Sequence, residues 1–111
     1  MESQEAIPAF AALAQATRLE AFRRLVAHGP GGMAAGDLAE RLGVPANTLS
    51  AHLNVLSRAG LVSSERRSRS ILYRANIDQV RALVLFLVAD CCGGEAGRCG
   101  PALADLLPDC N

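Results

Sequence analysis

The sequence predicts a mainly α-helical domain with one small β-hairpin, built from 111 residues. Apolar residues recur at helical spacing through most of the chain, and two short segments near residues 61–75 are strand candidates. Aromatic residues make up only 4% of the chain, so leucine, valine and alanine must form the core. Hydrophobic residues reach 50%, which argues against disorder, and this length suits one domain.

The first helix is expected over about residues 3–15, with one face formed by side chains three positions apart: Ile7, Phe10 and Leu13. A second helix begins at "TRLE", a capping box in which Thr17 is the cap and Glu20 reaches back to the cap amide. The stretch "HGPGG" at 28–32 ends this helix. Its expected apolar face consists of Leu19, Phe22, Leu25 and Val26.

A short third helix is expected at about residues 35–42, with Leu38 and Leu42 inward and Gly43 at its end. Pro45 can open a fourth helix, because the N–H that proline lacks is not needed in the first turn. That helix places three leucines inward, at positions 49, 53 and 56, and Gly60 stops it. Two helices joined by so tight a turn form a helix-turn-helix pattern.

The strand candidates "LVSSER" and "SILYRA" are separated by Arg67, Ser68 and Arg69, which predicts a hairpin with an arginine-rich tip. A last helix is expected from a cap at Asp78 to about Asp90, and it is almost entirely apolar. Such a helix needs more cover than one small domain gives, so we expect a homodimer formed through the terminal helices. The order of these elements is that of a winged helix-turn-helix domain.

Charge is distributed unevenly although the net charge is zero. Residues 41–74 hold six arginines and one glutamate, whereas residues 90–111 hold four acidic residues and one arginine. This pattern fits a DNA-facing centre with a separate regulatory end, and the alternative is a solvated surface that is merely uneven. The first residues lack a basic start and a continuous apolar stretch, so we expect a cytoplasmic protein with no membrane partner.

Three stretches resemble the signature segments of the ArsR/SmtB family of metalloregulatory repressors: "ALAQATRLEAFRRL", "LAERLGVPANTLSAHLNVLSRAGLV" and "ERRSRSILYRAN". The resemblance covers about residues 9–88. It implies a homodimer that binds a palindromic double-stranded operator and leaves it when an inducer binds, and it implies no enzymatic activity. Ser68 stands at the hairpin tip, where members of the family often carry glycine.

The outward positions near the start of the fourth helix are candidates for reading bases in the major groove, since their side chains are small or form hydrogen bonds. These positions are Ala46, Asn47, Thr48, Ser50 and Ala51. On the wing, Arg66, Arg67 and Arg69 can hold phosphates or enter the minor groove. The alternative is that all of these are simply exposed residues. His52 is expected to be packed or to contact phosphate.

Two ion sites of the family are missing from this chain. In "AAGDL", Ala34 and Gly36 stand where the best-known arsenic site has its thiols, and the last helix offers Asp78 but no histidine for zinc. The chain resembles instead a branch of arsenite-responsive repressors whose three cysteines follow the last helix. This resemblance assigns the inducer site to Cys91, Cys92 and Cys99.

The chemistry of three thiolates suits this assignment. Soft thiolates select thiophilic centres, and As(III) takes three ligands in a pyramid. We therefore expect As(III) or Sb(III) as inducer, and no catalytic cofactor. Residues 1–90 form the predicted DNA-binding and dimerisation domain, and residues 91–111 form the cysteine-containing inducer-binding tail.

Several alternatives remain open for the thiols. A four-coordinate site that includes Cys110 could hold zinc, cadmium or lead. The thiols could sense oxidation or be structural or inert, and a methylarsenical needs only the Cys91 and Cys92 pair. A thiol enzyme such as an arsenate reductase is disfavoured, because its reactive cysteine requires an electropositive surrounding, whereas these cysteines follow a helix C-terminus beside Asp90.

Overall fold

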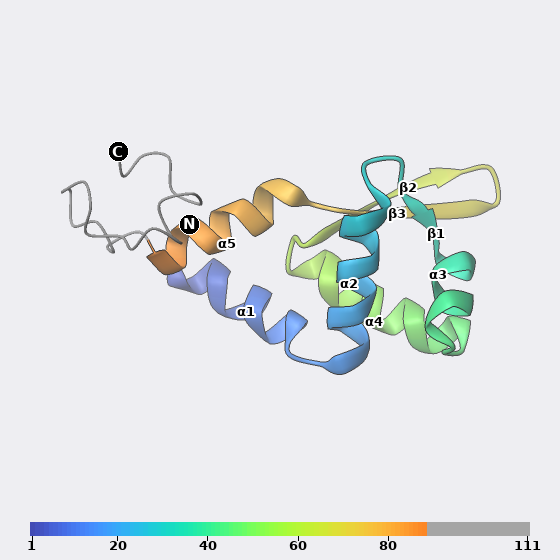
Figure 1. Cartoon of the computed structure of the whole chain (residues 1–111), viewed down its shortest axis with the longest axis horizontal. Coiled ribbons are helices and arrows are strands. Elements are labelled where there is room, and N and C mark those ends of the chain that lie inside the picture. Colours follow the sequence, from blue (N-terminus) through green and yellow to red (C-terminus); the bar gives the residue numbers. More distant parts are fainter. Residues whose placement is uncertain (89–111) are drawn as a thin grey trace.

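Figure 1 shows the computed structural model, which describes residues 1–88. The expected end of the last helix near Asp90, and the cysteines at 91, 92, 99 and 110, lie outside the described residues. The elements of the described part follow in this order: α1 (Ser3–Leu13), α2 (Ala16–His28), β1 (Met33–Ala34), α3 (Ala35–Leu42), α4 (Ala46–Arg58), β2 (Val62–Arg67), β3 (Ser70–Ala75) and α5 (Ile77–Val88).

The predicted fold class is confirmed, with one addition to the sheet. The hairpin of β2 and β3 carries a third antiparallel strand, β1, so that the strand order is β1-β3-β2. Met33 pairs with Tyr73, and Ala34 pairs with Leu72. Gly32 precedes β1 with a φ of 82°, and a Cβ on it would lie 3.3 Å from the carbonyl oxygen of Tyr73. Glycine is therefore required where β1 meets β3.

The core is built mainly from leucine, as expected for a chain with few aromatic residues. The helix α4 contacts α1, α2, α3 and β2, so it is held from several sides. Full burial of a leucine side chain contributes roughly 1.5–3 kcal/mol, so the core fixes α4 firmly. The largest fully buried side chains are Leu25, Leu38, Leu49, Leu53, Leu56 and Leu61.

The expected apolar face of α1 is confirmed only in part, because Phe10 and Leu13 pack against the core but Ile7 does not. Ala6, Ala9 and Ala12 are the buried residues of this helix, whereas Ile7 is 66% exposed. Phe10 and Leu13 are only half-buried. Alanine lets α1 lie close to its neighbours because it has no bulk beyond Cβ, and this close packing turns Ile7 to the outside.

Two features of α2 also differ from the expectation. The N-cap is Gln15 rather than Thr17, and the Gln15 side chain accepts a hydrogen bond of 2.8 Å from the N–H of Arg18. Phe22 is buried as expected, together with Ala21 and Leu25. Leu19 and Val26 are instead 46% and 42% exposed. The buried face of α2 is therefore narrower than the apolar face predicted from the sequence.

The turn between α3 and α4 follows the expectation closely. Gly43 ends α3 with a φ of 69°, and the N–H of Val44 donates to the carbonyl of Ala39 at 3.1 Å, as in a Schellman ending. Pro45 then occupies the N-cap position of α4. These local signals set the geometry of the helix-turn-helix.

The start of α5 is held by Asn76 rather than by Asp78. The Oδ1 of Asn76 accepts from the N–H of Gln79 at 3.4 Å, while its Nδ2 donates to the carbonyl of Gly60 at 2.9 Å. Asp78 lies in the first turn of the helix. Asn76 thus joins the beginning of α5 to the segment that follows α4. None of the helices within residues 1–88 has the length and apolarity to cross a membrane.

Candidate nucleic-acid interface

The N-terminal half of α4 presents a polar surface directly after the tight turn. Its three leucines are fully buried, which fixes the rotation of the helix. The side chain of Asn47 accepts a hydrogen bond of 3.0 Å from the N–H of Thr48, so its amide N–H groups stay available to a ligand. The residues predicted to read bases are all exposed: Ala46, Asn47, Thr48, Ser50 and Ala51.

Two further residues extend this surface. Asn54 and Arg58 are exposed, and with Asn47 and Ala51 they follow the spacing of four, three and four that keeps side chains on one face of a helix. Sequence reasoning stopped at the first two turns and missed them. The same spacing, continued along the helix, could have found both.

The three arginines of the wing do not act as one group. Arg66 pairs across the hairpin with Ile71, and Arg67 pairs with Ser70. Successive side chains of a strand point to opposite faces of the sheet, so Arg66 and Arg67 lie on opposite faces. Arg69 belongs to the loop at the tip.

Arg67 is engaged by an acidic neighbour. Its Nε donates to Oε2 of Glu65 at 2.6 Å, and Nη2 of Arg74 lies 3.1 Å from the other carboxylate oxygen. Hydrogen bonds from Arg67 and then Arg74 hold the pKa of the Glu65 carboxyl below its ordinary value. At neutral pH this carboxylate therefore neutralises part of the charge on that face of the wing.

The tip of the wing contains a strained residue. Ser68 has a φ of 54°, and among residues 1–88 it is the only residue other than glycine with a positive φ. Ser68 and Arg69 are the two central residues of the loop, since Arg67 pairs with Ser70. A positive φ at the first central residue alone matches a type II′ turn, in which glycine is preferred at that place.

Within residues 1–88 no group of three or more histidine, cysteine, aspartate or glutamate side chains could hold a metal ion. Ala34 lies just before α3, and Gly36 lies in its first turn. The candidate inducer ligands Cys91, Cys92 and Cys99 fall beyond the described part of the chain.

Known proteins share this arrangement. A family described as a helix-turn-helix domain matches residues 13–65. The HTH-type transcriptional regulator KmtR of Mycobacterium tuberculosis is 37% identical over 79 residues, which are 71% of this chain and 58% of that protein. The transcriptional repressor SdpR of Bacillus subtilis is 39% identical over 46 residues, which are 41% of this chain and 51% of that repressor. The matches thus span little more than half the length of these two relatives.

Solved structures agree over a larger share of their chains. An ArsR-like transcriptional regulator from Rhodococcus sp. RHA1 superimposes with a TM-score of 0.69 at 35% identity, covering 78% of each chain. The homodimeric winged helix-turn-helix DNA-binding domain of a Mycobacterium bovis protein gives a TM-score of 0.64 at 30% identity, also over 78% of each chain. With its helix-turn-helix, its wing and these relatives, the chain belongs to the ArsR family of winged helix-turn-helix transcriptional regulators.

Proposed function

We propose that this protein is an arsenite-responsive transcriptional repressor, which binds a palindromic operator as a homodimer and leaves it when As(III) or Sb(III) binds three thiolates. The observation that carries the proposal is the position of Cys91, Cys92 and Cys99 in the sequence, the first of which is three residues after Val88, the last described residue of α5. Residues 91–111 are then the inducer-binding tail, and the preceding residues bind DNA and dimerise.

DNA binding is supported by the surface of α4. An exposed row of small and amide side chains on a helix that follows a tight turn can enter the major groove and read base edges. Arg66 and Arg69 supply positive charge for phosphates at the wing. Repression is supported by the similarity to SdpR, which is named as a transcriptional repressor.

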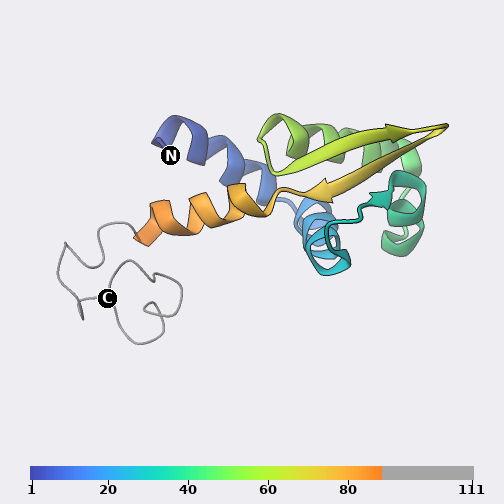
Figure 2. The same cartoon turned by 90° about the horizontal axis from the view of Figure 1, so that it is seen from above.

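Dimerisation is supported by the apolar surface at one end of the protomer. Both views place α1 and α5 at the end opposite to the hairpin tip (Figures 1 and 2). In α5 only Leu83 is buried, whereas Leu87 is 64% exposed, and Ile7 of α1 is exposed to a similar degree. The Mycobacterium bovis relative is homodimeric. A dimer formed through α1 and α5 would cover this surface. It would also present two recognition helices, one to each half-site of an operator whose half-sites are roughly 34 Å apart.

Sensing is supported by the chemistry of the donor set. Three thiolates satisfy three-coordinate As(III) without a fourth ligand, and thiolates select soft centres. Because Cys91 follows the described part of α5 closely in the sequence, we expect an ion that draws the thiols together to act on α5, the helix proposed to form the dimer. A coupling of about 1–3 kcal/mol between inducer and DNA is enough for release of the operator.

The experiment is a titration of the reduced protein on fluorescent promoter DNA, followed by anisotropy. Arsenite is added with a chelator present, and cadmium and zinc are added without it. Release at near-stoichiometric arsenite supports the proposal. Release by cadmium, zinc or peroxide but not by arsenite contradicts the proposed inducer while keeping the repressor. A methylarsenical that acts at lower concentration than arsenite assigns the site to the Cys91 and Cys92 pair.

A further inference from the structure

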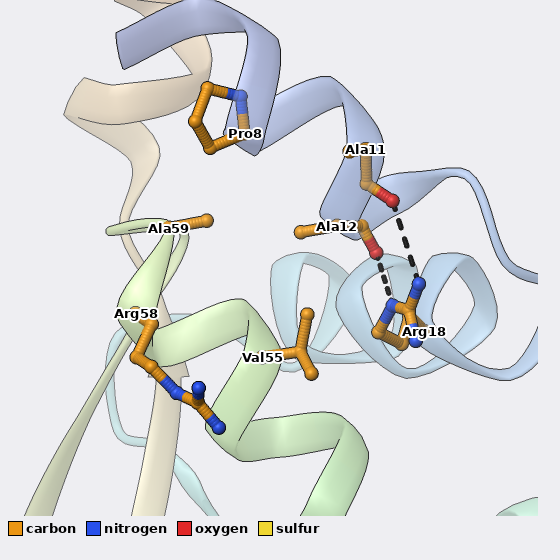
Figure 3. Close-up of a pocket in the computed structure, with 7 residues that line it drawn as sticks. All are labelled: Pro8, Ala11, Ala12, Arg18, Val55, Arg58 and Ala59. Atoms are coloured by element: carbon orange, nitrogen blue, oxygen red, sulfur yellow. Dashed lines mark hydrogen bonds between the residues drawn. The ribbon is translucent and has the colours of Figure 1, made fainter. Parts of the chain in front are cut away.

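Arg18 of α2 reaches back to the end of α1. Its Nε donates to the carbonyl of Ala12 at 2.6 Å, and its Nη2 lies 3.5 Å from the carbonyl of Ala11, as the dashed lines of Figure 3 show. Because α1 ends at Leu13, both carbonyls belong to its last turn, where that of Ala11 also accepts from the N–H of Ala14 at 3.2 Å. One guanidinium therefore fixes the C-terminal end of α1.

The same guanidinium contacts the recognition helix. Its Nη1 lies 3.4 Å from Nδ1 of His52, which is half-buried on α4 between Ala51 and Leu53. Arginine has only donors, so Nδ1 is the acceptor in this contact and the imidazole hydrogen is assigned to Nε2. Arg18 is thus a polar bridge from α1 to the middle of α4.

Beside this bridge the close packing of α1, which its buried alanines provide, ends at an open groove. This groove of about 350 Å³ lies between the two helices, and Figure 3 shows Pro8 and Ala12 of α1 across from Val55 of α4 and from Ala59, the residue that follows α4. Side chains that do not fill a space leave two helices less tightly fixed to each other. The hydrogen bonds of Arg18 therefore help the buried alanines to fix the angle between α1 and α4.

We propose that Arg18 is a positioning residue that couples the orientation of α1 to that of the recognition helix through His52. The inference rests on the proposed function, in which α1 contributes to the dimer and α4 to DNA binding. The partner protomer sets the orientation of α1 in the dimer, and Arg18 passes this orientation to α4. Operator affinity then depends on Arg18 although this residue does not touch DNA.

The test is a double-mutant cycle on the full-length protein, with operator affinity measured by anisotropy. Arg18→Met keeps the length of the side chain but removes its hydrogen bonds, and His52→Leu removes the acceptor. Each change alone is expected to weaken operator binding about tenfold, and the double variant to lose no more than about tenfold. Arg23→Met is the matched control on the exposed face of α2 and should change affinity less than about twofold.

A conservative variant separates positioning from simple loss of structure. Glutamine at position 52 retains an acceptor for Arg18, so His52→Gln should bind the operator within about twofold of the wild type. When Arg18→Met is also present, His52→Gln and His52→Leu should bind equally weakly. His52→Gln should therefore bind the operator better than His52→Leu only when Arg18 is present. If His52 acted by contacting phosphate directly, the difference between the two variants would not depend on Arg18. If Arg18→Met fails to fold, the operator affinities of His52→Gln and His52→Leu can still be compared in the protein with Arg18 intact.

Additive losses, about a hundredfold in the double variant, would overturn the coupling, because independent contacts add. Equal binding by His52→Gln and His52→Leu with Arg18 intact would overturn it as well. A wild-type protein that does not bind the operator contradicts the proposed function itself, whereas additivity in a protein that binds contradicts only the role of Arg18.

Discussion

Arg67 donates a hydrogen bond of 2.6 Å from its Nε to a carboxylate oxygen of Glu65, two residues earlier on the same strand. A phosphate that binds Arg67 must therefore compete with a carboxylate already in place. Arg66 and Arg69 make no ion pair within residues 1–88. The wing thus carries two kinds of arginine, although its sequence suggests a single basic group.

Removal of the arginines without an ion pair should weaken DNA binding most. We expect Arg66→Ala and Arg69→Ala each to lower the slope of log affinity against log salt by about one, as for one lost phosphate contact. Arg67→Ala should lower the slope by less, because Glu65 already neutralises that guanidinium. Anisotropy titrations at several salt concentrations measure the slope. If Arg67→Ala lowers the slope as much as Arg66→Ala does, the two arginines contribute equally to DNA binding and the proposed difference between them is wrong.

The interactions of Glu65 should give the wing an acid-sensitive contribution to stability. The pKa of Glu65 is lowered in the folded protein, so its contribution is complete above the ordinary value of 4.5 and is lost as the pH falls below it. In urea unfolding, the difference in free energy between wild type and Glu65→Gln should stay constant from neutral pH to about pH 5 and shrink towards about pH 3. A difference that does not change with pH would show that the ion pairs contribute nothing, as many exposed pairs do.

Glycine at position 68 should relieve the strained turn. A positive φ costs most residues roughly 1–2 kcal/mol, and glycine avoids this cost. Ser68→Gly should therefore raise the free energy of unfolding by about 1 kcal/mol, measured by urea denaturation. Ser70→Gly is the control at the neighbouring strand position, where φ is not positive and glycine should destabilise. Destabilisation by both changes would mean that the turn carries no strain.

A charge at Leu87 should separate the protomers without unfolding them. Leu87 is 64% exposed in the single protomer, so Leu87→Asp should leave the unfolding of the protomer nearly unchanged. If Leu87 lies in the dimer interface, burying an aspartate there raises the dimer Kd by about tenfold or more. Sedimentation velocity measures the shift. Val26→Asp is the control on another exposed apolar side chain, 42% exposed on α2, and it should leave the dimer intact.

The cysteines should separate inducer response from DNA binding. Cys91→Ser, Cys92→Ser and Cys99→Ser are each expected to bind the operator like the wild type and to lose release by arsenite, since each removes one of three thiolates. Cys110→Ser should respond normally. A large loss of response in Cys110→Ser would indicate a four-coordinate site, and a full response in all four variants would exclude the cysteines as inducer ligands.

Local sequence signals predicted the helix-turn-helix well. Gly43 permits the left-handed residue that ends α3, Pro45 favours a new helix start, and the leucines of α4 repeat at helical spacing. Each of these signals acts over a few residues and needs no distant partner. For that reason the α3 and α4 boundaries and the buried face of α4 could be derived from the sequence.

The errors arose where distant contacts decide. Hydrophobicity favoured Ile7 for the core, but close packing selects the alanines of α1, and that fit depends on helices far along the chain. Thr17 and Asp78 were plausible caps, yet both lie inside the first turn, and the capping contacts come from residues two positions earlier, Gln15 and Asn76. The strand β1 has only two residues, too few for a periodic pattern. The placement of Arg66 and Arg67 on opposite faces of the sheet, by contrast, could have been predicted from the alternation of side chains along a strand.

The short strand β1 has a consequence for any mechanism of release. Its pairing with β3 attaches the wing to the residue immediately before α3, so the sheet joins the wing directly to the helix-turn-helix. Bending between them would break the antiparallel ladder at Met33 and Tyr73. If the protein works as proposed, an inducer that releases the operator without breaking this pairing must change how the two DNA-binding units lie relative to each other. On the proposed function we therefore expect release to change the geometry of the pair of protomers while the pairing of β1 with β3 stays intact.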